Sequence, residues 1–305
     1  MSGNGTPPDP VAGGSHCAEP TPRALFVLGA SDPEMHAIER LLTEVHAPFM
    51  HAMVGGKRVY PANAYRARLP LQADSLRLCG TRIYLVECVD PAPPGVRRID
   101  HHRPGDPGYA HPPVTYWQAS SIGQTVAVLR EEGLATIAIT PEMRMTAAAD
   151  HCLGAAYRGD CPGVEPDALL RWHVASRAAF ERRSAEDVLA DIAATQRTLR
   201  QAPRVMLNDD CKTADVRHAR VPELLLAAAS AGQCCLSAVV ARDGRTKIGC
   251  LVGSPAQIAA FMQEWAPAHG LVDVYGDPLR GFAGAYVPRQ AAGRGAAQLT
   301  AARET

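Results

Sequence analysis

Short apolar runs alternate with amphipathic segments along the first half of the chain. Residues 24–28 form a β-type run, and apolar positions with helical spacing follow over 35–42. A second β-type run covers 83–89, and the segment 118–132 has the pattern of a helix. We expect 136–140 to be the next strand or a buried segment. Because strands alternate with helices, the pattern predicts a parallel α/β sheet.

The second half of the chain changes its pattern twice. After Asp150 the pattern is mainly helical, and a helix is expected from Ser184, which stands at the N-cap position before early acidic residues. Beyond Arg204 apolar runs and helices alternate again. Asp243-Gly244 lies between two β-type runs and indicates a hairpin. These features predict a second, smaller α/β unit.

We therefore expect a parallel-sheet domain followed by a smaller C-terminal α/β domain. The predicted divisions are a disordered tail over 1–22, the parallel-sheet domain over 23–180, a helical connector over 181–203, the C-terminal domain over 204–288 and a flexible tail over 289–305.

Composition restricts the partners of the protein. The 305 residues include 31 basic and 31 acidic ones, so no overall field attracts nucleic acid or an anionic membrane. Aromatic residues make up only 5%, which disfavours a long nucleic-acid channel. The nine cysteines include no CxxC pair, as expected of free thiols in a reducing cytoplasm. Neither a signal peptide nor a membrane span is predicted, so the chain is expected to be cytoplasmic.

Acidic and histidine side chains follow successive strand-like runs. Asp32 follows the first run, Asp90 the second, and Asp100-His101-His102 a third run over 96–99. Ligands collect beyond the carboxyl ends of parallel strands, and carboxylates with imidazoles suit manganese or magnesium. The sequence therefore predicts a divalent metal site at this edge.

This part of the chain resembles the DHH phosphoesterase superfamily. The resemblance rests on Ile99-Asp100-His101-His102 at a strand end, a preceding strand that ends in Asp90, the small-residue helix ASSIGQT and the later Ala-Ala-Ala-Asp150. RecJ exonucleases, the NrnA group, cyclic dinucleotide phosphodiesterases and family II inorganic pyrophosphatases belong to this superfamily.

The C-terminal half is similar to the DHH-associated domain of these proteins. The stretch 276–285 is similar to the family's glycine-rich GGGHxxAAG motif, and DGRTKIG is similar to its characteristic hairpin. The resemblance implies that these segments bind the phosphate end of a substrate. The residues expected to do so are Arg245, Lys247, Arg280, Gly281 and Gly284.

Roles for the strand-end residues are implied by the same resemblance. It makes Asp90 a bridge between two Mn²⁺ or Mg²⁺ ions, His101 and Asp150 ligands of the second ion, His102 the residue facing the scissile phosphate, and Asp100 a support for the histidines. His151 could be a ligand or a proton donor, but it is expected to point away from its neighbour Asp150, because adjacent helix positions differ by about 100°.

The first motif of the family departs from its pattern in this chain. Asp32 and Glu34 fill the two acidic places, but Leu28 stands where the family has a histidine. One ligand of the first ion is therefore missing from its usual position. His36, one helical turn beyond Asp32, or His51 from elsewhere in the fold are the candidate replacements.

Together these features predict a manganese- or magnesium-dependent phosphodiesterase or phosphatase. Its expected substrate is a small nucleotide or a short oligonucleotide, with no membrane or long duplex as partner, and a homodimer is compatible with the sequence. One alternative is a non-catalytic nucleotide-binding or regulatory protein with a degenerate DHH site. Another is an enzyme with one zinc or iron ion at His101, His102 and His111.

Overall fold

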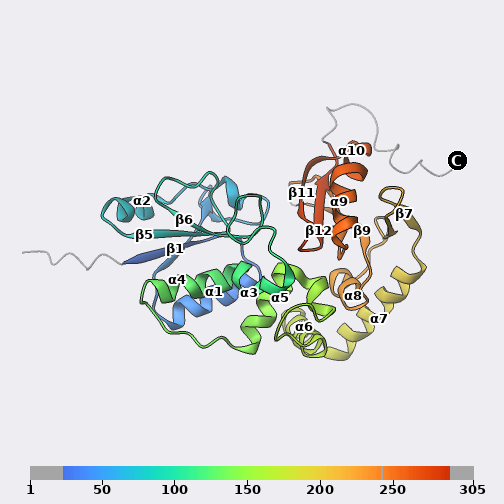
Figure 1. Ribbon diagram of the computed structural model, residues 1–305, viewed down its shortest axis with the longest axis horizontal. Coiled ribbons are helices and arrows are strands. Elements are labelled where there is room, and N and C mark those ends of the chain that lie inside the picture. The colour runs from blue at the N-terminus through green and yellow to red at the C-terminus, as the bar shows by residue number, and fades with distance from the viewer. Residues whose placement is uncertain (1–22, 242, 289–305) are drawn as a thin grey trace, which may run out of the picture.

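The computed structural model describes residues 23–241 and 243–288, which form two main sheets connected by helices (Figure 1). The tails predicted over 1–22 and 289–305 lie outside the described residues. One sheet is entirely parallel and the other is mixed. The α/β class with a parallel sheet is thus confirmed, whereas the division into two domains stays a prediction.

The first sheet has four parallel strands in the order β2-β1-β5-β6. These strands are β1 (Ala24–Leu28), β2 (Phe49–His51), β5 (Arg82–Val86) and β6 (Arg97–Ile99). All five residues of β1 are buried, because helices or loops cover both faces of the sheet. The strand ends meet at one edge, where the predicted metal residues follow.

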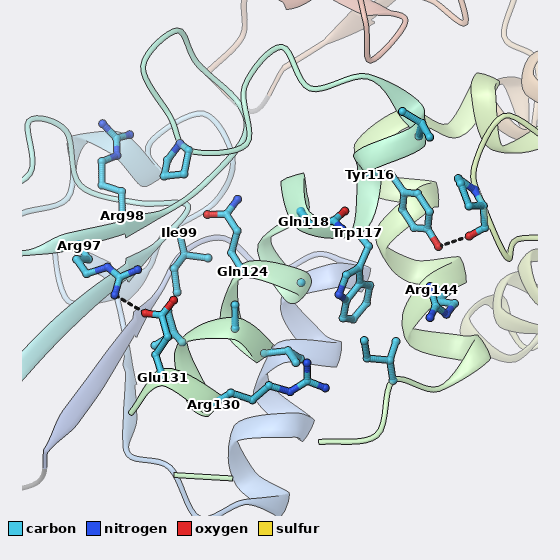
Figure 2. Close-up of a pocket in the computed structure, with 18 residues that line it drawn as sticks. Arg97, Arg98, Ile99, Tyr116, Trp117, Gln118, Gln124, Arg130, Glu131 and Arg144 are labelled. Carbon is cyan, nitrogen blue, oxygen red and sulfur yellow. Dashed lines mark hydrogen bonds and ion pairs between the residues drawn. The ribbon is translucent and has the colours of Figure 1, made fainter. Parts of the chain in front are cut away.

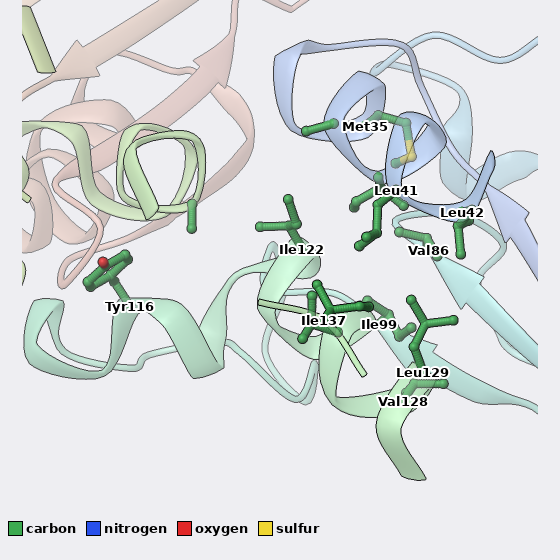
Figure 3. Packing of buried hydrophobic residues seen from close by; sticks show 14 of the residues in the cluster. Met35, Leu41, Leu42, Val86, Ile99, Tyr116, Ile122, Val128, Leu129 and Ile137 are labelled. Atoms are coloured by element: carbon green, nitrogen blue, oxygen red, sulfur yellow. The ribbon is translucent and has the colours of Figure 1, made fainter. Parts of the chain in front are cut away.

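Side chains of the parallel sheet alternate between two apolar clusters. Phe26 and Leu28 pack with α1 (Pro33–Glu44), α4 (Ser121–Glu131) and α5 (Pro141–Tyr157), whereas Leu25 and Val27 pack against the 52–73 segment. Figure 3 shows the first cluster, in which Met35 and Leu42 of α1 lie near Val86 of β5. Leu28, at the family's histidine position, is fully buried here.

Three helices lead from the first sheet to the second. After α5 come α6 (Pro166–Glu181) and α7 (Ala185–Gln201), at the lower right of Figure 1. The helix predicted from Ser184 is present as α7, and the Ser184 side chain accepts a hydrogen bond from the Asp187 N–H. This hydroxyl satisfies one of the N–H groups that a helix start leaves unpaired.

The second sheet has six strands in the order β11-β12-β10-β9-β8-β7. They are β7 (Arg204–Met206), β8 (Lys212–Asp215), β9 (Cys235–Val240), β10 (Thr246–Leu251), β11 (Val272–Asp277) and β12 (Phe282–Tyr286). The hairpin predicted at Asp243-Gly244 joins the antiparallel strands β9 and β10. Helix α9 (Pro255–Ala260) and the following turns cover one face of this sheet.

The remaining elements are short. They are β3 (Met53–Val54), β4 (Lys57–Arg58), η1 (Ala64–Arg66), α2 (Leu71–Leu78), η2 (Pro113–Thr115), α3 (Tyr116–Ala119), α8 (Leu224–Ser230), η3 (Phe261–Trp265) and α10 (Ala266–Ala268). Within the described ranges no helix is long and apolar enough to cross a membrane. The cysteines in these ranges are all free thiols.

The segment 136–140 differs from the predicted strand, although the alternative expectation of a buried segment holds in part. It has no regular secondary structure, and Ile137 is its one buried residue. The Ile137 carbonyl accepts a hydrogen bond from the Arg130 side chain at 2.6 Å. Because this segment does not pair with β6, that strand remains the edge of the parallel sheet.

Candidate metal centre

Four potential metal ligands converge at the carboxyl edge of the parallel sheet. Ligand atoms of Glu87, His101, His102 and Asp150 all lie within 4.8 Å of one another. Glu87 directly follows β5, the two histidines follow β6, and Asp150 lies on α5. This group of four residues is called the metal-binding group below.

Glu34 approaches the metal-binding group from the first turn of α1. The His101 Nε2 atom lies 3.0 Å from Asp150 Oδ2, 3.6 Å from Glu87 Oε1 and 3.8 Å from Glu34 Oε2. Glu34 is 1% exposed, and its other oxygen accepts a hydrogen bond from the Ile122 N–H. Three carboxylates from three elements therefore surround one imidazole nitrogen.

Hydrogen bonds on the far side of His101 fix the protonation of its ring. The His151 Nε2 atom lies 3.1 Å from the His111 carbonyl, which can only accept, so Nε2 carries the proton. In a neutral ring, Nδ1 of His151 is then an acceptor, and it lies 3.0 Å from Nδ1 of His101. His101 thus donates from Nδ1 and keeps a lone pair on Nε2, facing the carboxylates.

Burial keeps both rings neutral. It lowers the pKa of His101 well below its ordinary value and the pKa of His151 to about 4, and the charge of Arg280 lowers both further. The imidazole of His101 is therefore oriented as a metal ligand, with its second nitrogen anchored through His151.

Three buried atoms at this point have no hydrogen-bond partner among the described residues. They are Glu34 Oε2, Glu87 Oε1 and His101 Nε2, and all three are acceptors. Burial and neighbouring carboxylates raise the pKa of Glu34 and of Glu87 well above the ordinary value. Acceptors that face one another in a buried space are compatible only if a proton or a cation lies between them. This donor set fits a divalent cation.

Two neighbouring residues of α5 contact His101. Asp150 contacts Nε2 of His101, and His151 contacts Nδ1 on the other side of the ring. The two side chains thus lie on opposite sides of the His101 ring, and His151 does not join the metal-binding group. The helix is interrupted directly after His151, where Cys152 has a non-helical conformation (φ −155°, ψ 61°).

Asp100 supports the two histidines without joining the metal-binding group. Its carboxylate accepts the N–H groups of His101 at 2.8 Å and of His102 at 3.1 Å, and it lies 3.0 Å from His102 Nδ1. The Tyr65 hydroxyl also donates to it. These donors hold the pKa of Asp100 well below its ordinary value. His102 is thereby fixed through Nδ1, with its side chain 37% exposed.

Asp90 lies outside the metal-binding group, contrary to the sequence prediction. Its carboxylate is 37% exposed and pairs with Arg98 at 3.2 Å and Arg103 at 2.9 Å. The strand ends at Val86, so Glu87 is the first acidic residue at the sheet edge. The chain then turns, with φ of 51° at Glu87 and 59° at Val89. Glu87 could have been predicted as a candidate metal ligand, because it directly follows the buried strand β5.

Asp32 and His36, both predicted as metal ligands, also lie outside the metal-binding group. Asp32 caps α1 by accepting the Met35 N–H at 2.7 Å, and burial together with Asp150 raises its pKa to about 6. His36 Nε2 lies 2.8 Å from the Ser31 hydroxyl, away from the metal-binding group. His51 pairs with Glu39 at 3.0 Å. Neither histidine replaces the ligand that is missing at Leu28.

Arg280 links the second sheet to the metal centre instead of presenting a free cation. Its guanidinium donates to the carbonyls of His151 at 2.9 Å, His101 at 3.1 Å and Asp150 at 2.9 Å. Its side chain is 12% exposed. The glycine-rich stretch thus lies beside the Asp-His-His segment, and its arginine bonds to the backbone of the candidate ligands.

The other predicted phosphate-binding residues lie on β10 and β12 or in the hairpin. Arg245 is paired with Asp243 at 2.8 Å and Asp273 at 2.6 Å. Lys247 lies over the rings of Tyr275 and Phe282. The two glycines are sterically required: a Cβ at Gly284 would lie 2.7 Å from the Tyr275 ring, and Gly281 has a φ of 73°. Their role in substrate binding stays a prediction.

The chain matches no protein-family model and no curated protein. The candidate site therefore rests on its own geometry, namely a compact group of Glu, His and Asp residues that could hold a metal ion.

Proposed function

We propose that the protein is a metal-dependent phosphoesterase that acts on a small nucleotide or a short oligonucleotide. The observation that supports this most strongly is the set of three buried acceptors, Glu34 Oε2, Glu87 Oε1 and His101 Nε2, that lack hydrogen-bond partners within the described residues. The DHH resemblance of residues 99–102 adds the reaction class.

In this proposal the ion is held by three residues of the metal-binding group, Glu87, His101 and Asp150, together with Glu34, while His102 of that group faces the substrate. A bound Mn²⁺ or Mg²⁺ ion supplies an acidified water and neutralises charge on a phosphoryl group. Asp32, on the neighbouring helix start, is the acidic residue available to a second ion. Burial and nearby carboxylates raise the pKa of Asp32, Glu34 and Glu87, so these carboxyls hold protons more readily than usual in the metal-free protein, and a divalent ion would take the place of those protons.

His102 is the residue best placed to contact the substrate. Asp100 fixes its Nδ1 atom, so the partly exposed ring can present Nε2 to a phosphoryl oxygen or a leaving group. Lys247, with Tyr275 and Phe282, offers a cation and ring surfaces for the remainder of a nucleotide. The Gly276 carbonyl and the Asp277 side chain bond to residues 109–110, which brings this sheet close to the Asp-His-His segment.

The second candidate is a nucleotide-binding protein without hydrolytic activity. Two observations favour it: Leu28 is buried in the core, and Asp90 lies outside the metal-binding group. Both residues stand at positions where the resemblance implies a metal ligand. A single zinc or iron ion with His111 is less favoured, because the His111 ring is absent from the metal-binding group.

Purified protein assayed against pAp, pGpG, short RNA and DNA, cyclic dinucleotides and pyrophosphate separates these candidates. We expect manganese-dependent hydrolysis in the wild type and in Asp90→Asn, and its loss in Glu87→Gln. Tight binding of one of these compounds without turnover, unchanged by chelator, would instead support the nucleotide-binding protein.

A further inference from the structure

A second pocket lies along the outer edge of β6, separate from the metal-binding group. Its volume is about 810 Å³, and it is lined mainly by residues of β6, α3, α4 and the start of α5, and by Ile139. Figure 2 shows arginines from three of these elements around it. Ligand pockets commonly have volumes of roughly 300–1,000 Å³. None of the four residues of the metal-binding group lines it.

The pocket has an excess of positive charge. Four arginines and one carboxylate, Glu131, line it. Arg97 is paired with Glu131 at 2.7 Å, and Arg98 with Asp106 at 2.9 Å. For Arg130 and Arg144, no carboxylate of the described residues forms an ion pair. Two guanidinium groups therefore remain available to an anion.

One of the two available guanidinium groups is positioned by a neutral partner. Arg130 Nη2 donates to the Ile137 carbonyl at 2.6 Å, while Arg144 extends from α5 beside Tyr116, whose hydroxyl donates to the Pro162 carbonyl at 3.2 Å. Each group has several further N–H donors, because a guanidinium has five. Fixed arginine forks of this kind match the oxygens of a phosphate.

A flat apolar surface accompanies these charges. The Trp117 side chain lines the pocket next to Tyr116 and Gln118, as Figure 2 shows. It is partly exposed. An indole face can stack on a nucleobase, and the Gln118 amide can bond to its edge. We propose that this pocket binds a mononucleotide, with its phosphate on Arg130 and Arg144 and its base on Trp117.

Some residues that line the pocket also hold the Asp-His-His segment in place. Gln124 lines it and also donates to the Asp100 carbonyl at 3.1 Å, while its oxygen accepts the Asp100 N–H at 3.2 Å. Ile99 and Arg98 also line it, directly before Asp100. A nucleotide bound here contacts the residues that position the Asp-His-His segment, so the site is distinct from the metal centre but adjacent to it.

Equilibrium dialysis with AMP in the presence of EDTA tests this proposal. We expect wild type and Glu87→Gln to bind AMP alike, and Arg130→Gln/Arg144→Gln to bind about 100-fold more weakly through the loss of two charged contacts. The exposed pair Arg197→Gln/Arg200→Gln on α7 is the charge-matched control and should bind as wild type does.

Trp117→Leu keeps an apolar residue while removing the ring, and it should weaken AMP binding without changing competition by inorganic phosphate. Circular dichroism checks that each variant is folded. Absence of AMP binding in wild type, equal binding by the double arginine variant, or loss of binding only in Glu87→Gln would overturn the proposal.

Discussion

Replacing Glu87 with glutamine should make the metal-free protein more stable while making it respond less to manganese. The Glu87 Oε1 atom is buried and lacks a hydrogen-bond partner among the described residues. It lies 3.6 Å from the His101 Nε2 atom, which carries a lone pair. Leaving a buried polar group unpaired costs about 1–3 kcal/mol. Because a glutamine amide has the same shape but donates hydrogen bonds to these acceptors, we expect the free energy of unfolding in EDTA to rise by about that amount.

In the presence of manganese, the wild type should have a higher free energy of unfolding than Glu87→Gln. At a metal concentration of about 100 times Kd, binding stabilises the wild type by about 2.7 kcal/mol. If loss of this carboxylate raises Kd 100-fold, the same concentration stabilises Glu87→Gln by only about 0.4 kcal/mol. Urea unfolding with EDTA and with manganese measures both differences.

The pH dependence of this comparison has a definite sign. Burial and nearby carboxylates raise the folded-state pKa of Glu87 well above 4.5. Its contribution to the stability of the metal-free wild type is therefore complete below pH 4.5 and is lost as pH rises above it. The advantage of Glu87→Gln in EDTA should grow over that range.

Asp90→Asn is the matched control for Glu87→Gln. It removes a carboxylate at the same sheet edge, but one that is 37% exposed and paired with arginines, so its effect on stability should be about 0–1 kcal/mol. Its manganese-induced stabilisation should equal that of the wild type. The reasoning is refuted if Glu87→Gln destabilises the metal-free protein and keeps the full response to manganese.

Three further predictions concern the surroundings of the metal centre. Arg280→Lys keeps the charge but loses the fork that bonds three carbonyls, so the unfolding free energy should fall by about 2–4 kcal/mol in urea titrations. Asp100→Asn should lower the kcat of hydrolysis about 10–100-fold through misorientation of His102, with the bound manganese measured by mass spectrometry unchanged. Asp32 has its pKa raised from 3.8 to about 6, so the metal-free wild type should lose stability, on the order of 2 kcal/mol, as pH rises from about 4 to 6. Asp32→Asn, which preserves the helix cap, should remove that loss in pH-dependent thermal unfolding.

Much of the fold follows from local sequence patterns. The apolar run of β1, the N-cap Ser184 and the Asp-Gly hairpin each produce the predicted element, because short-range sterics and hydrogen bonding determine them. The 136–140 segment also has β-type residues, but a strand needs a partner edge, and pairing is a tertiary event.

The site was predictable at His101 and Asp150 but not at the end of β5. The segment 87–90 contains two acidic residues, and only tertiary packing buries Glu87 while leaving Asp90 exposed beside two arginines. The position of Arg280 likewise depends on how the second sheet packs against α5, which local patterns do not encode. The kink at Cys152, directly after His151, is a further feature that local patterns did not predict.

The most direct test of the metal centre is a crystal structure of the protein soaked with manganese, with anomalous scattering recorded. The account predicts an anomalous peak bound by Glu34, Glu87, His101 and Asp150, at about 2.0–2.4 Å from their ligand atoms. A density map without such a peak, in which water or a shared proton joins Glu34 Oε2, Glu87 Oε1 and His101 Nε2, would contradict it.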